Sequence, residues 1–144
     1  SMTELAITYR GVVYPWHCDH IGHMNVMWYV GKFDEGTWHL LASVGLTPTY
    51  LREQKRGMVA VQQTLTYKRE LRAGDLVTVR SGVLEMKEKS IRFFHEMRNE
   101  ETGEVAAIAM CTGVHTDSES RRACPFPIEI MERGQAMIVE YDLS

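Results

Sequence analysis

The residues with the clearest capacity for chemistry stand together in the sequence YPWHCDHIGHMNVMWY, between residues 14 and 29. This stretch places an acid, Asp19, just before a segment with helical spacing, together with three histidines, His17, His20 and His23. An ionised carboxylate can attack a carbonyl carbon or activate a water molecule. The start of a helix offers unpaired backbone N–H groups and a positive dipole end, which stabilise an oxyanion. The pattern suits acyl transfer, and it equally suits an Asp that only makes a turn before a helix.

Two other chemistries fit parts of the same stretch less well. The histidines and Cys18 are metal-ligand types, but the H-x2-H-x2-H spacing is not the i, i+4 helical pair of zinc hydrolases. No second ligand cluster is evident in the sequence, so we expect no metal. Cys18 is a candidate nucleophile beside Asp19 and His20, but neighbours in sequence point in different directions.

The spacing of apolar residues predicts the elements that must position this stretch. Residues 7–14 are rich in β-branched and aromatic types and predict a strand. Asn25 suits a helix cap, and apolar residues recur with a helical period from 28 to 44. Gly45 then suits the end of that helix. Gly31 and Gly36 lie inside it, and glycine lowers the stability of a helix. We therefore expect another element to pack closely against the helix face that carries them.

The rest of the chain predicts a short helix at 49–55 and then a series of strands. Period-two spacing begins at residue 57, and further strands are expected at 76–84, 90–98 and 105–115, joined by short turns at 71–75 and 99–103. A short amphipathic segment is expected near the C-terminus. Short turns imply antiparallel hairpins, so we expect one long helix against a small sheet, an α+β fold. Because strands alternate their faces, at most one of Gln62 and Gln63 is expected to face the helix.

The segment CDHIGHMNVMWYVGKFDEG, followed by YKRE and GDLVTV, resembles the acyl-CoA thioesterases of the hotdog fold. It is closest to the 4-hydroxybenzoyl-CoA thioesterase-like family, over about residues 8–117. The resemblance implies a long central helix wrapped by a curved antiparallel sheet of about five strands. It also implies a catalytic carboxylate at Asp19, with His23 and Asn25 beside it in the site. The backbone N–H groups of Val26 and Met27 would grip the thioester carbonyl, although this chain has Val26 where the family often has a second Asn.

The resemblance further implies a function and a set of supporting residues. The expected reaction is hydrolysis of an acyl-CoA thioester to a carboxylic acid and free CoA, with no cofactor because coenzyme A is part of the substrate. Glu35 matches a helix acid common in the family and is a possible support for the loop. The bases expected to contact the CoA phosphates are Lys68, Arg69 and Arg72. Two alternatives keep the fold: a hydratase or dehydratase of acyl thioesters pairing His23 with Glu35, and a non-catalytic acyl-CoA binding module.

Length and composition set the remaining expectations. The chain has 144 residues, 44% apolar and 24% charged, which is typical of one globular domain over residues 1–144, with Ser1 as a probable cloning remnant. The net charge of -3 argues against a nucleic-acid partner, and the short apolar runs argue against a membrane span. Three widely spaced cysteines favour the reducing cytoplasm over a disulfide framework. A small sheet with open edges predicts a homodimer or homotetramer. The acyl group is not specified by the sequence.

Overall fold

A computed structural model describes residues 5–142, and Ser1 lies outside them. The elements along the chain are β1 (Ala6–Val12), the 3-10 turn η1 (Pro15–His17), α1 (Val26–Ser43), α2 (Pro48–Glu53), β2 (Arg56–Tyr67), β3 (Leu76–Met86), β4 (Ser90–Asn99), β5 (Val105–Asp117) and α3 (Ile128–Ala136). Each predicted strand and helix is present, with ends shifted by a few residues. The amphipathic C-terminal segment is the helix α3.

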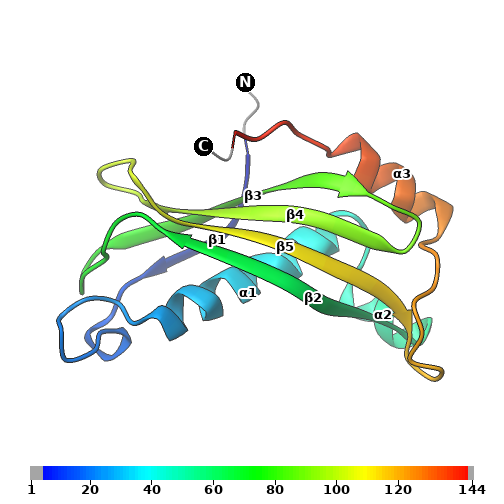
Figure 1. The fold of residues 1–144 in the computed structure, drawn as a ribbon, viewed down its shortest axis with the longest axis horizontal. Helices are drawn as coiled ribbons and strands as arrows, with labels where there is room; N and C mark the ends of the chain where they lie inside the picture. The colour runs from blue at the N-terminus through cyan, green and yellow to red at the C-terminus, as the bar shows by residue number, and fades with distance from the viewer. Residues whose placement is uncertain (1–4, 143–144) are drawn as a thin grey trace.

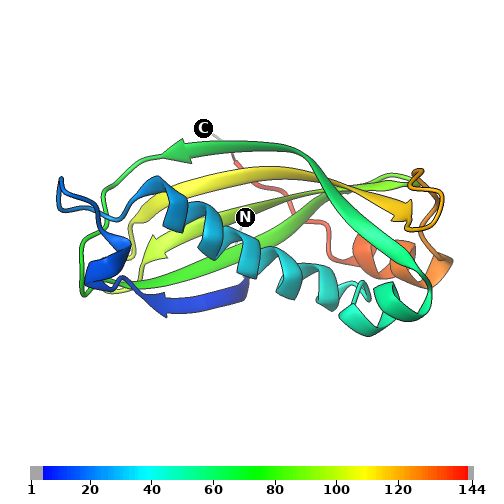
Figure 2. The same cartoon turned by 90° about the horizontal axis from the view of Figure 1, so that it is seen from below.

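The five strands form one antiparallel sheet in the order β1-β3-β4-β5-β2. The sheet curves over α1, which lies along its concave side (Figures 1 and 2). The long central helix and the wrapped sheet of the predicted α+β hotdog fold are therefore confirmed. β1 and β2 are the edges of the sheet.

Helix α1 begins and ends where the local sequence dictates. Asn25 is its N-cap, and Gly45 follows its end with φ of 102°, a backbone conformation that glycine adopts without strain. The buried face repeats at helical spacing and consists of Tyr29, Lys32, Phe33, Gly36, Leu40 and Leu41. A Cβ at Gly36 would lie 2.9 Å from Thr8 Oγ1, whereas a Cβ at Gly31 would meet nothing within 4 Å. The predicted close packing therefore holds at Gly36 and is wrong at Gly31.

Two apolar clusters fill the space between α1 and the sheet. The cluster around Phe33 lies under the first half of the helix, and the cluster around Leu40 lies under the second half. Between them the buried ring of His95 bridges helix and sheet, with Nε2 2.7 Å from Thr37 Oγ1 and Nδ1 2.5 Å from Ser81 Oγ. Burial lowers the pKa of His95 to about 4, so this link is neutral and fixes α1 without a buried charge.

The edge strand β2 keeps much of its apolar surface exposed. Val59 and Val61 are 49% and 56% exposed. The alternating apolar residues that predicted this strand are therefore not buried at these two positions. The β2–β5 register shifts between Ala60 and Gln62, which marks a bulge or similar irregularity. No helix within residues 5–142 is long and apolar enough to cross a membrane.

Candidate active site

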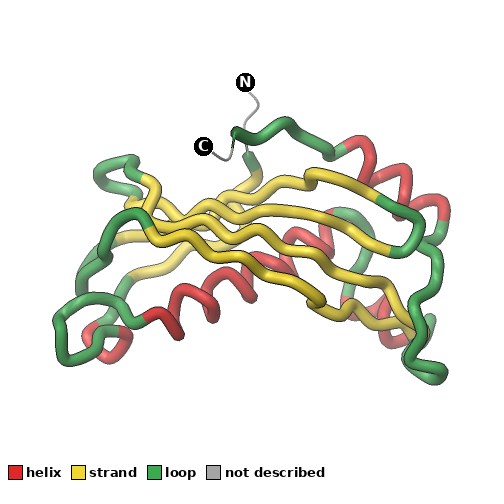
Figure 3. The backbone as a smooth tube through the Cα atoms, viewed as in Figure 1, coloured by secondary structure: helices red, strands yellow, loops and turns green. Residues whose placement is uncertain are grey.

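The loop between η1 and α1 is a tight turn pinned to the body of the protein. Asp19 N–H donates to His23 O at 3.1 Å, and Gly22 N–H donates to Asp19 O at 3.0 Å, with Gly22 at φ of 95°. Met24 N–H then donates to Leu71 O at 2.7 Å, in the turn that follows β2. Figure 3 shows this loop and the β2–β3 turn at the same end of the molecule. The backbone therefore fixes the position of Asp19 relative to the start of α1.

The carboxylate of Asp19 accepts one hydrogen bond on each oxygen. Asn25 Nδ2 donates to Oδ2 at 3.0 Å, and the backbone N–H of Ile21 donates to Oδ1 at 3.0 Å. The bond from Asn25, followed by the bond from Ile21, lowers the pKa of Asp19 below its ordinary value of 3.8. Asp19 is therefore an ionised carboxylate at neutral pH, held in one orientation.

Asn25 connects this carboxylate to the helix start. Its Nδ2 group donates to Asp19, while its Oδ1 accepts from Met27 N–H at 3.0 Å as the N-cap of α1. Of the two N–H groups predicted to grip a carbonyl, that of Met27 is thus already engaged by the cap. The Val26 N–H has no acceptor within the described part of the chain and is the one left for a substrate oxygen.

A cavity of about 290 Å³ opens where the loop and the helix start face the end of β2. His23, Val26 and Tyr29 line one side, and Tyr67, Lys68, Arg69 and Glu70 line the other. His23 Nε2 lies 2.9 Å from Glu70 Oε2 across it. Asp19 does not itself line this cavity, but Asn25, which holds the Asp19 carboxylate, directly precedes Val26, whose free N–H can hold and polarise a carbonyl group placed there.

The sequence model of a protein family, the thioesterase-like superfamily, matches residues 13–134, which are most of the chain. The chain belongs to that superfamily. Among curated proteins it is 24% identical to a betainyl-CoA thioesterase of Pseudomonas aeruginosa, over 94% of this chain and 86% of the relative. The predicted family and the thioesterase class of enzyme are thereby confirmed.

Two solved structures of similar fold are a protein in complex with CoA and a CoA thioesterase. A hypothetical protein of Staphylococcus aureus in complex with CoA superposes with a TM-score of 0.87 at 18% identity, covering 100% of this chain and 93% of that one. A gentisyl-coenzyme A thioesterase superposes with a TM-score of 0.76 at 25% identity, covering 88% and 98%.

The thioesterase fold brings some predicted residues to the cavity and leaves others away from it. Lys68 and Arg69 line the cavity, but Arg69 Nε also pairs with Glu104 at 2.9 Å. Arg72 lies in the turn beyond, where its backbone N–H donates to Asp75, and it does not line this cavity. The structure thus splits the predicted cluster of three bases.

Glu35 is not brought to the loop that carries Asp19. It lines a groove on the β1 side of α1, together with Thr8, Arg10 and His39. His23, the histidine that the hydratase alternative pairs with Glu35, pairs instead with Glu70. The acid-base pair that this alternative requires is therefore not formed.

The thioesterase fold also holds a second cavity. It has a volume of about 110 Å³ and lies between α1 and the strands β2, β4 and β5. Asp34, Thr37 and Trp38 line its helix side, and both Gln62 and Gln63 line its sheet side. Gln62 and Gln63 follow the register shift and pair in regular succession with Thr112 and Cys111, so the expectation that at most one of these glutamines faces the helix stays a prediction.

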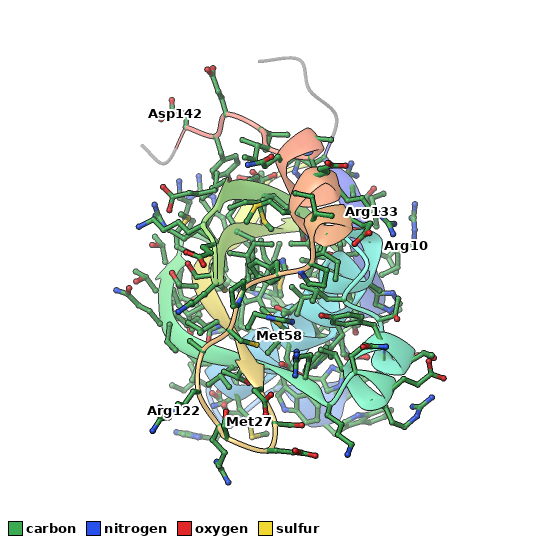
Figure 4. The ribbon with its side chains drawn as sticks, turned by 90° about the vertical axis from the view of Figure 1, so that its right-hand side faces the viewer. Arg10, Met27, Met58, Arg122, Arg133 and Asp142 are labelled. Atoms are coloured by element: carbon green, nitrogen blue, oxygen red, sulfur yellow. The ribbon has the colours of Figure 1, made fainter. Side chains whose placement is uncertain are left out.

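Met58 lines this second cavity from β2. Its side chain points from β2 into the molecule (Figure 4) and packs against the cluster around Leu40. The sequence could have indicated the helix side of this cavity. Val30, Asp34 and Trp38 are spaced four residues apart and therefore share one side of the predicted helix.

Within the histidine-rich stretch, His17 has a structural role. His17 is buried, its Nδ1 accepts from Tyr14 N–H at 3.1 Å, and its ring packs on Trp28 with centroids 4.3 Å apart. Burial, with Lys32 nearby, lowers the pKa of His17. No group of three His, Cys, Asp or Glu side chains among residues 5–142 is placed to hold a metal ion.

Proposed function

We propose that this protein hydrolyses acyl-CoA thioesters to a carboxylic acid and free CoA. The observation that carries the proposal is the ionised Asp19 carboxylate, held by Asn25 beside the unpaired Val26 N–H at the start of α1. A thioester carbonyl in the adjoining cavity would accept a hydrogen bond from Val26 and lie within the positive end of the helix dipole. Both interactions strengthen as negative charge develops on that oxygen.

Asp19 has two routes to the same products. As a general base it takes a proton from water while the water oxygen adds to the carbonyl carbon, and the C–S bond then breaks. As a nucleophile it forms an anhydride with loss of the CoA thiolate, and water then cleaves the anhydride. In both routes the proton that water gives up ends on the departing thiol. Asn25 is a positioning residue in either case, because it acts through Asp19 and the helix cap.

The residues around the cavity support the binding of coenzyme A. Lys68 is a cation at its edge with no carboxylate partner within the described residues, and Arg69 and Arg72 follow in the same turn. Bases of this kind bind phosphate groups well. His23 holds the loop to the end of β2 through Glu70, which keeps the two sides of the cavity together. The names of the relatives, betainyl-CoA thioesterase and gentisyl-coenzyme A thioesterase, support CoA thioesters as the substrate class.

The decisive experiment measures free thiol release from a panel of acyl-CoAs, with hydration of an enoyl-CoA run alongside. We expect thiol release from the wild-type protein and a loss of roughly 100-fold or more in Asp19→Asn, the lower end of the effect of a general base. Glu119→Gln is a matched control, because Glu119 is an exposed carboxylate that pairs with Lys55. A single-turnover reaction in ¹⁸O-labelled water separates the two routes, because only the nucleophilic route can place ¹⁸O in the carboxylate of Asp19.

Three results would refute the proposal. Near wild-type turnover in Asp19→Asn would reduce Asp19 to a turn residue. Hydration of enoyl-CoA without thiol release would indicate the hydratase alternative, and binding of CoA esters without turnover would indicate a binding module.

A further inference from the structure

The second cavity combines an acid with an aromatic wall. Asp34 and Trp38 stand one helical turn apart on α1, and Phe93 lines the cavity from the sheet. No Lys, Arg or His is among the residues that line this cavity. Its charge is therefore that of one carboxylate beside indole and phenyl rings.

The carboxylate of Asp34 is unpaired in the protein itself. Within residues 5–142 it makes no hydrogen bond and no ion pair, whereas Lys32 on the same helix donates a hydrogen bond to Tyr9. Trp38 is 44% exposed, so part of its ring is available to a ligand. A carboxylate and an aromatic face together attract a cation, through charge and through the electrons of the ring.

This cavity and the one at Asp19 lie along the same pair of elements. Tyr29 of α1 packs on Tyr67 of β2 at the first cavity, with ring centroids 5.2 Å apart. Further along the same strand, Gln63 and Met58 face the later turns of α1 in the second cavity. Val26 lines the first cavity, Val30 lines the second one helical turn later, and both are exposed, so a ligand that follows this face of α1 from Val26 would reach the second cavity.

The separation along the helix sets the length of that ligand. Asp34 is eight residues after Val26, and at about 1.5 Å per residue this places it roughly 12 Å further along α1. The side chain leans back towards the helix start and shortens the gap by part of a turn. A charge that reaches Asp34 must lie at the far end of an acyl chain, away from the thioester.

We propose that the second cavity selects acyl groups with a permanent positive charge at the end remote from the thioester, held by Asp34 and Trp38. This rests on the proposed function, because it takes the thioester to be bound at Asp19. Asp34 is then a specificity-determining residue and has no part in the bond cleavage.

The test compares pairs of CoA thioesters that differ only in charge. The long pair is 6-(trimethylammonio)hexanoyl-CoA and its neutral isostere, 7,7-dimethyloctanoyl-CoA. The short pair is trimethylammonioacetyl-CoA and 3,3-dimethylbutyryl-CoA, in which the cation lies next to the thioester and cannot reach Asp34. We expect the wild-type protein to prefer the cation of the long pair in kcat/KM. Because Asp34 is exposed in the protein itself, Asp34→Asn should reduce that preference by about two- to fivefold and leave the neutral ester within about twofold.

Two variants sharpen the comparison. Glu35→Gln removes the same charge from the next residue, on the β1 side of α1, and should leave the preference unchanged. Trp38→Leu keeps an apolar side chain without the ring, and should lower the preference for the cation in the same direction as Asp34→Asn. Far-ultraviolet circular dichroism and the mass in solution are recorded for every variant.

The specificity inference is overturned if the wild-type protein hydrolyses the neutral ester of the long pair as well as or better than the cation. It is also overturned if Asp34→Asn and Glu35→Gln change the preference equally, or if Asp34→Asn changes the mass in solution and not the preference, which would make Asp34 a contact to a second copy. Each of these results leaves thioester hydrolysis standing. Failure to release thiol from any of the four esters or from short neutral acyl-CoAs would overturn both proposals together.

Discussion

Asn25 performs two tasks with its two side-chain atoms, and substitutions can separate them. Asn25→Ala removes both the cap on Met27 N–H and the hydrogen bond to Asp19. Loss of an Asn cap costs about 1 kcal/mol of stability, which for a chain of this length lowers the midpoint of thermal unfolding by about 2–4 °C. Loss of the bond to Asp19 removes the largest cause of its lowered pKa.

Asn25→Asp keeps the first task and reverses the second. An Asp caps a helix as well as Asn and interacts favourably with the helix dipole, so stability at neutral pH should stay near that of the wild type. The new carboxylate faces Asp19 where an amide now donates at 3.0 Å, and repulsion between like charges raises the pKa of Asp19.

The assay is the pH dependence of kcat/KM for thiol release, which reports the pKa of the free enzyme's essential groups. In the wild-type protein the lowered pKa keeps Asp19 ionised as the pH falls, so we expect the acid limb of the profile to lie below the ordinary pKa of an Asp, 3.8. Both variants should move this acid limb to higher pH, while only Asn25→Ala should lose thermal stability. Asn99→Ala is the control, because Asn99 also accepts backbone N–H groups in a turn but holds no carboxylate. An acid limb that stays in place in both Asn25 variants would show that Asp19 is not the essential titrating group.

Three further predictions concern coenzyme binding, assembly and packing. Replacing Lys68, Arg69 and Arg72 by Gln should raise KM for an acyl-CoA a few-fold, more at low salt, and leave the matching acyl-pantetheine unaffected, since exposed phosphate contacts are weak and screened. Light scattering at micromolar concentration should give a dimer or larger assembly, because β2 is a long edge strand with exposed apolar side chains, and a mass near 16.5 kDa would contradict this. Gly36→Ala should destabilise the protein by about 1–3 kcal/mol, since the new methyl would meet a threonine oxygen at 2.9 Å. Gly31→Ala, whose methyl meets open space, should stabilise by about 0.5–1 kcal/mol, and urea unfolding of the two variants checks the contrast.

The sequence by itself determined the elements and the placement of an acid just before the start of α1. Helical period, strand alternation, the Asn25 cap and the glycine after the helix are local signals, because each depends on residues within a few positions of one another. The placement of Asp19 before a capped helix is local for the same reason. The family resemblance then directed attention to that acid.

The tertiary structure decided which side chains meet. His23 and Glu70 lie on different elements, and only the pairing of the loop with the turn after β2 brings them to 2.9 Å. The neighbouring acids Asp34 and Glu35 show most clearly what the sequence could not decide, namely which of them lines the second cavity. Consecutive helical residues point about 100° apart, so one of two neighbouring acids faces β2 and the other faces β1. Which direction holds a cavity depends on the order of strands in the sheet, and that order is set by hydrogen bonds between residues far apart in the chain.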